Sequence, residues 1–142
     1  PELNLVLAGA RNVDFGLIDN YHYLDIFEIK KPNTKLLSAN TDRGNYYWHQ
    51  DSVKAITQAE KYLFNAERGG SKLVEDIERE IGKSVKLVKP RSILLIGHSD
   101  QLDEKNKKTD FRILRNALKN IEIILYDELL ERLKNQRDKV YE

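Results

Sequence analysis

The segment Glu28-Ile29-Lys30 places a carboxylate and an ammonium group two residues apart. It closes the apolar run 23–27, which predicts a strand, and side chains two apart leave a strand on the same face. Carboxylate oxygens bind divalent cations that lower the pKa of a bound water, and a lysine stabilises negative charge developing on a phosphate. Beside a second acid, this pair is therefore suited to metal-dependent phosphodiester hydrolysis.

Asp14 is the predicted second acid, although Asp25 is closer in the sequence. Strand alternation turns Asp25 away from Glu28 and Lys30, which excludes it as their partner. A hairpin that pivots at Tyr21 through an odd-length loop would put Asp14 on the right face. The expected cross-strand pairs are Asp14 with Glu28, Gly16 with Ile26, and Ile18 with Leu24.

The predicted roles follow from ligand chemistry. Asp14 and Glu28 would bind Mg²⁺ or Mn²⁺ through oxygen atoms, together with the Ile29 backbone carbonyl and several waters. Lys30 would orient the attacking water or stabilise the pentavalent transition state. Glu-x-Lys occurs once in the chain, although charge pairs also arise by chance on exposed strand faces.

The surrounding pattern predicts an α/β fold in which helices flank a mixed sheet. Three strands at the start would form an antiparallel meander, and the later strands, separated by helices, would pair in parallel. The expected strands are 3–7, 13–18, 23–29, 85–88, 92–96 and 121–125. The expected helices are 52–67, 72–82, one that starts at Thr109 or Asp110, and one capped by Asp127.

Two features outside the strands have alternative interpretations. The aromatic loop segment Tyr46-Tyr47-Trp48 is either a mobile cover over a substrate or a set of side chains packed back onto the domain. On the following helix, Gln58 and Tyr62 are one turn apart and share a face. They are either a polar helix face with one aromatic on its core side or a second part of the site.

Composition limits the possible classes of protein. The chain has 142 residues, a net charge of +1 and no cysteine, which predicts one domain over residues 1–142 and excludes disulfides and Cys-ligated zinc. No apolar run reaches bilayer length, so we expect a soluble protein without a membrane partner, and the lack of cysteine fits a cytoplasmic location. The three histidines, His22, His49 and His98, lack zinc-ligand spacing. The chain starts at Pro1 and contains no methionine, so we expect the C-terminal part of a longer protein.

Local charge is uneven despite the near-neutral total. Basic residues gather around 83–91 and 105–115, and acids gather around 75–80. These clusters are either solvated surface or contacts to phosphates.

The ordered motifs resemble a known family. Asp14, Glu28-x-Lys30 and Gln58-x-x-x-Tyr62 are similar to the PD-(D/E)xK nuclease pattern with the helix motif of RecB-like members, although Val13 stands where Pro is frequent. More narrowly, the chain resembles the C-terminal nuclease domain of the Shedu anti-phage defence family. The segments that carry this resemblance are 11–15, 23–32, 55–58 with 62–63, 89–91 with 96–97, and 123–130.

The resemblance implies a restriction-endonuclease-like core, divalent-metal cleavage of DNA and assembly into a homo-oligomer. It assigns metal binding to Asp14 and Glu28, the catalytic cation to Lys30, and support of the active site to Gln58 and Tyr62. Two alternatives stay open. One is a catalytically silent module that binds DNA or assembles partners, with the final helix as an interface. The other is a DNA repair or junction-processing nuclease with the same site.

Overall fold

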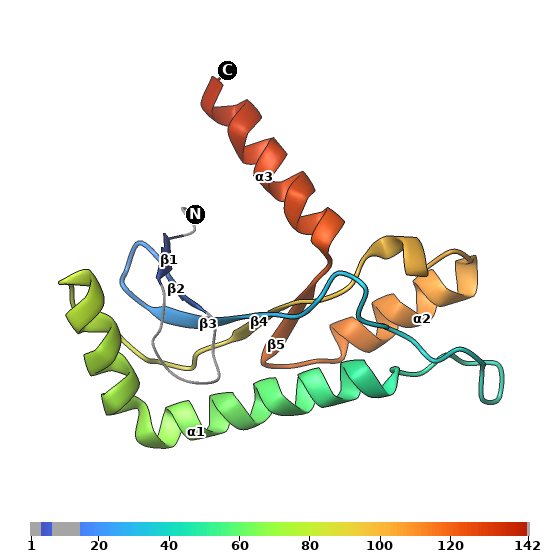
Figure 1. The fold of residues 1–142 in the computed structure, drawn as a ribbon, viewed down its shortest axis with the longest axis horizontal. Helices are drawn as coiled ribbons and strands as arrows, with labels where there is room; N and C mark the ends of the chain where they lie inside the picture. Colours follow the sequence, from blue (N-terminus) through green and yellow to red (C-terminus); the bar gives the residue numbers. More distant parts are fainter. Residues whose placement is uncertain (1–3, 7–14, 142) are drawn as a thin grey trace.

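The computed structural model describes residues 4–6 and 15–141, and its centre is one five-stranded sheet (Figure 1). The strands lie side by side in chain order. The β1–β2 and β2–β3 pairs are antiparallel, whereas β3–β4 and β4–β5 are parallel. The elements are β1 (Asn4–Val6), β2 (Phe15–Ile18), β3 (Leu24–Ile29), α1 (Gln50–Ile81), β4 (Ser92–Leu95), η1 (Ser99–Gln101), α2 (Lys105–Asn116), β5 (Ile121–Ile124) and α3 (Tyr126–Tyr141). The predicted α/β fold with a mixed sheet is confirmed.

The β2–β3 hairpin has the predicted register. Gly16 pairs with Ile26 and Ile18 with Leu24 across a loop of odd length, residues 19–23. The Asp19 carboxylate holds this loop, because its Oδ1 accepts hydrogen bonds from the backbone N–H groups of Tyr21 and Tyr23, both at 2.9 Å. Asp14, for which the register was predicted, lies outside the described residues.

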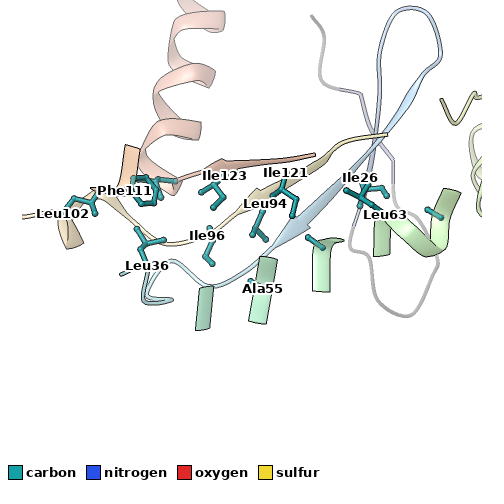
Figure 2. Close-up of a cluster of buried hydrophobic side chains, with 13 residues drawn as sticks. Ile26, Leu36, Ala55, Leu63, Leu94, Ile96, Leu102, Phe111, Ile121 and Ile123 are labelled. Atoms are coloured by element: carbon teal, nitrogen blue, oxygen red, sulfur yellow. The ribbon is translucent and has the colours of Figure 1, made fainter. Parts of the chain in front are cut away.

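Helix α1 covers one face of the sheet, and only the start of α3 packs on the other. On one face Ala55 and Leu63 of α1 pack against Ile26, Leu94 and Ile121 (Figure 2). On the opposite face, α3 leaves the end of β5 and projects away from the sheet (Figure 1). There the Phe27 side chain belongs to a separate cluster, against which Leu129 packs. Because Ile26 and Phe27 are consecutive residues of β3, the two clusters show directly that alternate β3 side chains serve opposite layers.

The predicted break between two helices at 67–72 is present as a kink. Gly69 has non-helical dihedral angles, φ −116° and ψ 25°, so α1 consists of two helical arms that meet there. Both arms pack on the sheet, because Ala66 before the kink and Ile77 after it are buried in two neighbouring clusters. A glycine costs little at such a distortion, so helical residues follow it directly and no loop separates the arms.

Three other predicted boundaries are corrected. Residues 85–88 form only an isolated bridge through Lys86, before the chain turns at Lys89 with a φ of +45°. Helix α2 begins at Lys105, so Asp110 lies inside the helix and does not cap it. The Asp110 carboxylate instead accepts from the Tyr46 N–H at 2.9 Å. Helix α3 begins at Tyr126, and the Asp127 carboxylate accepts from the Ser99 N–H at 3.1 Å.

The aromatic loop packs back onto the domain. The Trp48 ring meets the Phe111 ring edge to face, with centroids 5.9 Å apart. The Tyr46 hydroxyl donates a hydrogen bond of 2.5 Å to the Glu104 carboxylate. The packing interpretation is therefore confirmed for these two side chains, whereas Tyr47 remains about half exposed.

Candidate active site

Glu28 is a buried carboxylate at the C-terminal end of β3. Only 5% of the residue is exposed. Alternation places it on the same face as Leu24 and Ile26, which is the face covered by α1. A buried carboxylate requires interactions that stabilise its charge, so its position near a strand end is a specific feature of this fold.

Lys30 and Gln58 meet in the structure, as a strand end and a helix that are 28 residues apart in the chain. The Lys30 Nζ donates a hydrogen bond of 3.0 Å to the Gln58 Oε1. This contact aims the ammonium group along the α1 face without neutralising it, because the amide carries no charge. The structure therefore joins the Glu-x-Lys element with the predicted helix element.

Tyr62 lies close enough to Glu28 for the carboxylate charge to change the pKa of its phenol. It is half-buried and packs against the core cluster that α1 shares with the sheet. Burial raises the pKa of its phenol above the ordinary value, and the nearby Glu28 charge raises it further. The phenol therefore stays protonated near neutral pH and can donate a hydrogen bond.

The backbone around Lys30 is held by groups that the sequence patterns did not single out for the site. The Lys30 N–H donates to the Leu95 carbonyl at 2.8 Å, and the Tyr126 hydroxyl donates to the Lys30 carbonyl. Gly97 joins the segment after β3 to the start of α3. Its N–H donates to the Lys31 carbonyl at 3.2 Å, and its carbonyl accepts from the Tyr126 N–H at 2.9 Å. The position of Gly97 and Tyr126 directly after two buried parallel strands is the signal that could have identified them.

Gly97 also requires the absence of a side chain. Its φ is +69°, and an added Cβ would lie 2.8 Å from a Leu36 methyl group and 3.1 Å from the Thr34 carbonyl oxygen. Both the backbone conformation and the space exclude other residues there. The loop after β3 can therefore pass directly over the end of β4.

Asp25 has a different partner from Glu28 and Lys30. Its Oδ1 accepts a hydrogen bond of 2.9 Å from the Arg91 N–H, next to the start of β4. This contact joins β3 to the segment before β4, at the end of the strands opposite to Lys30. A structural role for Asp25 agrees with its exclusion by strand alternation.

The donor groups near Glu28 are carboxylate and carbonyl oxygens, the type of ligand that a divalent metal such as Mg²⁺ takes. In the described part of the chain, no three side chains of His, Cys, Asp or Glu gather closely enough to hold an ion. Mg²⁺, however, usually takes only one or two carboxylates and keeps several waters. The Ile29 backbone groups point away from β4, because the next residue, Lys30, pairs with Leu95 of that strand. One buried carboxylate with a carbonyl alongside suits an oxygen-binding cation.

Other candidate groups lie elsewhere. His98 Nδ1 accepts from the Asp100 N–H at 3.0 Å and caps η1, and His49 caps α1 in the same way. A cavity of about 910 Å³ lies along β5 between α2 and α3, and neither Lys30 nor Gln58 lines it. Among the described residues, no helix is both long and apolar enough to cross a bilayer.

Comparison of the sequence with known proteins assigns the chain to a family. The family model of the C-terminal region of Shedu protein SduA matches residues 2–130. Shedu protein SduA of Bacillus cereus (strain B4264) is 31% identical over 111 residues, which are 77% of this chain and 29% of that protein. The chain thus spans less than a third of the length of that relative. With most of its residues matched, the chain belongs to the Shedu SduA C-terminal family.

Proposed function

We propose that this chain carries the active site of a divalent-metal-dependent deoxyribonuclease that acts in cytoplasmic anti-phage defence. The observation that supports it most is the meeting of a Lys30 ammonium with Gln58, beside the buried Glu28 carboxylate. Residues from a strand and from a distant helix converge there on one face of the sheet. Family membership supports the same proposal.

Asp14 and Glu28, together with the Ile29 carbonyl, would hold Mg²⁺ or Mn²⁺. When bound, the ion lowers the pKa of a water and neutralises charge on the phosphate. The register of the described hairpin, Gly16 with Ile26, is the one from which the pairing of Asp14 with Glu28 was predicted. Asp14 therefore remains the proposed second carboxylate.

The chain's own groups would stabilise the transition state. The Lys30 ammonium would face the negative charge that grows on the attacked phosphate, and Gln58 would position it through the 3.0 Å hydrogen bond. A neutral amide suits this task because a carboxylate in its place would cancel the charge of Lys30. Tyr62, kept protonated by its raised pKa, would donate a hydrogen bond on the Glu28 side.

The test is Mg²⁺-dependent cleavage of DNA by the full-length protein and by Lys30→Ala. We expect Lys30→Ala to lose about 100-fold or more of the cleavage rate, as for the loss of one preorganised electrostatic group. Its circular dichroism should be unchanged. Lys31→Ala is the matched control, because Lys31 is the exposed neighbour with the same charge, and it should cut at nearly the normal rate.

The outcomes also separate the alternatives. Equal cutting by Lys30→Ala and the unmodified protein would reject the catalytic role of Lys30. DNA that shifts in mobility without products in any divalent metal would identify a silent binding module. A strong preference for branched over linear DNA would instead favour a repair or junction-processing nuclease.

Self-assembly is a second proposal, supported by the free face of α3. Leu130 and Leu133 are 53% and 47% exposed, although they lie one turn apart on the helix. With Leu129 and Tyr126 they line a hollow of about 340 Å³ whose surface is almost entirely apolar. A second copy of the chain would cover this face, so Leu130→Glu with Leu133→Glu should lower the mass measured by light scattering. An unchanged mass would reject α3 as the contact.

A further inference from the structure

One flank of α1 carries cations at a regular spacing. Lys54, Lys61 and Arg68 are seven residues apart, so they are nearly aligned on the helix, with a rise of about 10 Å between neighbours. All three are exposed. None forms an ion pair with any carboxylate in residues 15–141. We call these three residues the cationic flank.

The cationic flank adjoins the candidate active site. Gln58 is four residues after Lys54 and three before Lys61, so its side chain is a surface neighbour of both. The same Gln58 accepts the hydrogen bond from Lys30. The row of cations therefore runs directly past the group that would position the catalytic lysine.

In the turns around Lys61, charge on α1 is segregated around the helix axis. Gln58 lies about 60° to one side of Lys61, whereas Glu60 lies about 100° to the other side. Glu67, seven residues after Glu60, follows it on that acidic side. A polyanion on the Gln58 side would therefore contact the cations and avoid Glu60 and Glu67, and the one carboxylate of α1 on that side before the kink is Asp51, in the first turn.

Two of the cations form cation–π contacts with the ring of Phe64. Its ring is on the surface, 49% exposed for the whole residue. The Lys61 Nζ lies 5.3 Å and the Arg68 Cζ 5.1 Å from the ring centroid. Both cations are thus attracted to one ring and are not spread at random over the surface.

We propose that the backbone of double-stranded DNA runs along the cationic flank of α1, with its phosphates against Lys54, Lys61 and Arg68. This inference rests on the proposed nuclease function and adds the path of the substrate. A strand of duplex DNA has one phosphate per 3.4 Å of axis, so a row of cations about 21 Å long spans the axial rise of about six phosphates. The path passes Gln58 and so presents the strand to Lys30.

A competing path exists along the cavity at the edge of β5. Five cations line it, beside four carboxylates: Arg91, Lys108, Arg112, Arg115 and Arg132, with Asp100, Asp103, Glu122 and Glu128. Arg115 pairs with Glu128 and Arg132 with Glu122, so part of the positive charge of this cavity is already balanced. That cavity also lies away from Gln58, which does not line it.

The experiment measures the affinity of the full-length protein for a short duplex in EDTA over a range of salt concentrations. We expect Lys54→Ala with Lys61→Ala to make the slope of log affinity against log salt less negative by about 2, close to one unit for each lost phosphate contact. Lys108→Ala with Arg112→Ala removes the same charge from the competing path and should leave the slope unchanged. Circular dichroism establishes that both variants are folded.

The other outcomes overturn the inference in distinguishable ways. A slope change only in the Lys108 and Arg112 variant would place the DNA at the β5 edge. An unchanged slope in the α1 variant, when the unmodified protein cuts DNA in Mg²⁺, would reject the path and keep the nuclease. An unmodified protein that neither binds nor cuts duplex DNA would reject both.

Discussion

Two pairs of an acid and a base, Arg115 with Glu128 and Lys30 with Glu28, differ in the partners of their charged groups. Arg115 of α2 forms a bidentate ion pair with Glu128 of α3, at 2.8 and 2.9 Å, and also donates to the Ile123 carbonyl. Lys30 instead donates to the neutral amide of Gln58, while the charge of Glu28 is felt by the phenol of Tyr62. The Arg115–Glu128 pair neutralises itself, whereas the Lys30 ammonium is hydrogen-bonded to a neutral group.

The difference separates a structural role from a chemical one. Glu128 also accepts from the Leu125 N–H at 3.0 Å, so the first pair binds α2 and α3 to the outer edge of β5. Such a pair stabilises the fold and has little charge left for a substrate. Lys30 is held without being neutralised, which is what a group needs if it is to act on a phosphate.

The largest expected effect comes from exchanging the two acids for amides. Glu28→Gln should lower Mg²⁺-dependent cleavage about 100-fold or more, since it removes a proposed metal ligand, and should leave the fold intact. Glu128→Gln should destabilise the fold and leave the cleavage rate at low temperature nearly normal. Cleavage rates and urea unfolding of both variants give the comparison. Equal effects of both on cleavage would remove the distinction.

The next effect concerns the stability of the β5 edge. Arg115→Ala leaves Glu128 without its cation and frees the Ile123 carbonyl, so it should lower the free energy of unfolding by about 2–3 kcal/mol. Lys119→Ala, a nearby exposed cation, is the control and should change the free energy by less than about 0.5 kcal/mol. Urea unfolding followed by circular dichroism measures both. Similar midpoints for the two variants would show that the ion pair contributes nothing.

A smaller effect is expected in acid. Burial acts to raise the pKa of Glu128, but hydrogen bonds from Arg115 and the Leu125 N–H outweigh it and lower the pKa below 4.5. A carboxylate with a lowered folded-state pKa adds stability above its unfolded pKa and loses it as the pH falls through the folded value. Stability should therefore decline below about pH 4.5, and less steeply in Glu128→Gln. Parallel acid curves for both proteins would contradict this role of Glu128.

The smallest effect tests strand alternation. Asp25→Asn keeps an acceptor for the Arg91 N–H, so it should cost less than about 1 kcal/mol and change cleavage less than twofold. Asp14→Asn should lower cleavage far more, because Asp14 is the proposed second metal ligand. Cleavage rates in Mg²⁺ decide between them. Equal losses would refute the assignment of the two acids to opposite faces.

The sequence predicted the local pattern around the site well, for physical reasons. Side chains alternate along any strand, so the separation of Asp25 from Glu28 needed no tertiary information. The pairing of Gly16 with Ile26 was predicted on the condition of an odd-length loop, and the loop 19–23 meets that condition. Helix boundaries were predicted less well, because Asp110 and Asp127 accept hydrogen bonds from distant residues and so do not act as caps.

What the sequence by itself determined is the set of groups: an acid and a lysine on one strand face, and an amide and a phenol one helical turn apart. Only the tertiary structure decided that Lys30 reaches Gln58, because parallel pairing and the packing of α1 bring the two together across 28 residues. It also decided that Gly97 and Tyr126 hold the Lys30 segment. Local periodicity records which face a residue occupies, but contacts between distant segments depend on how the layers pack.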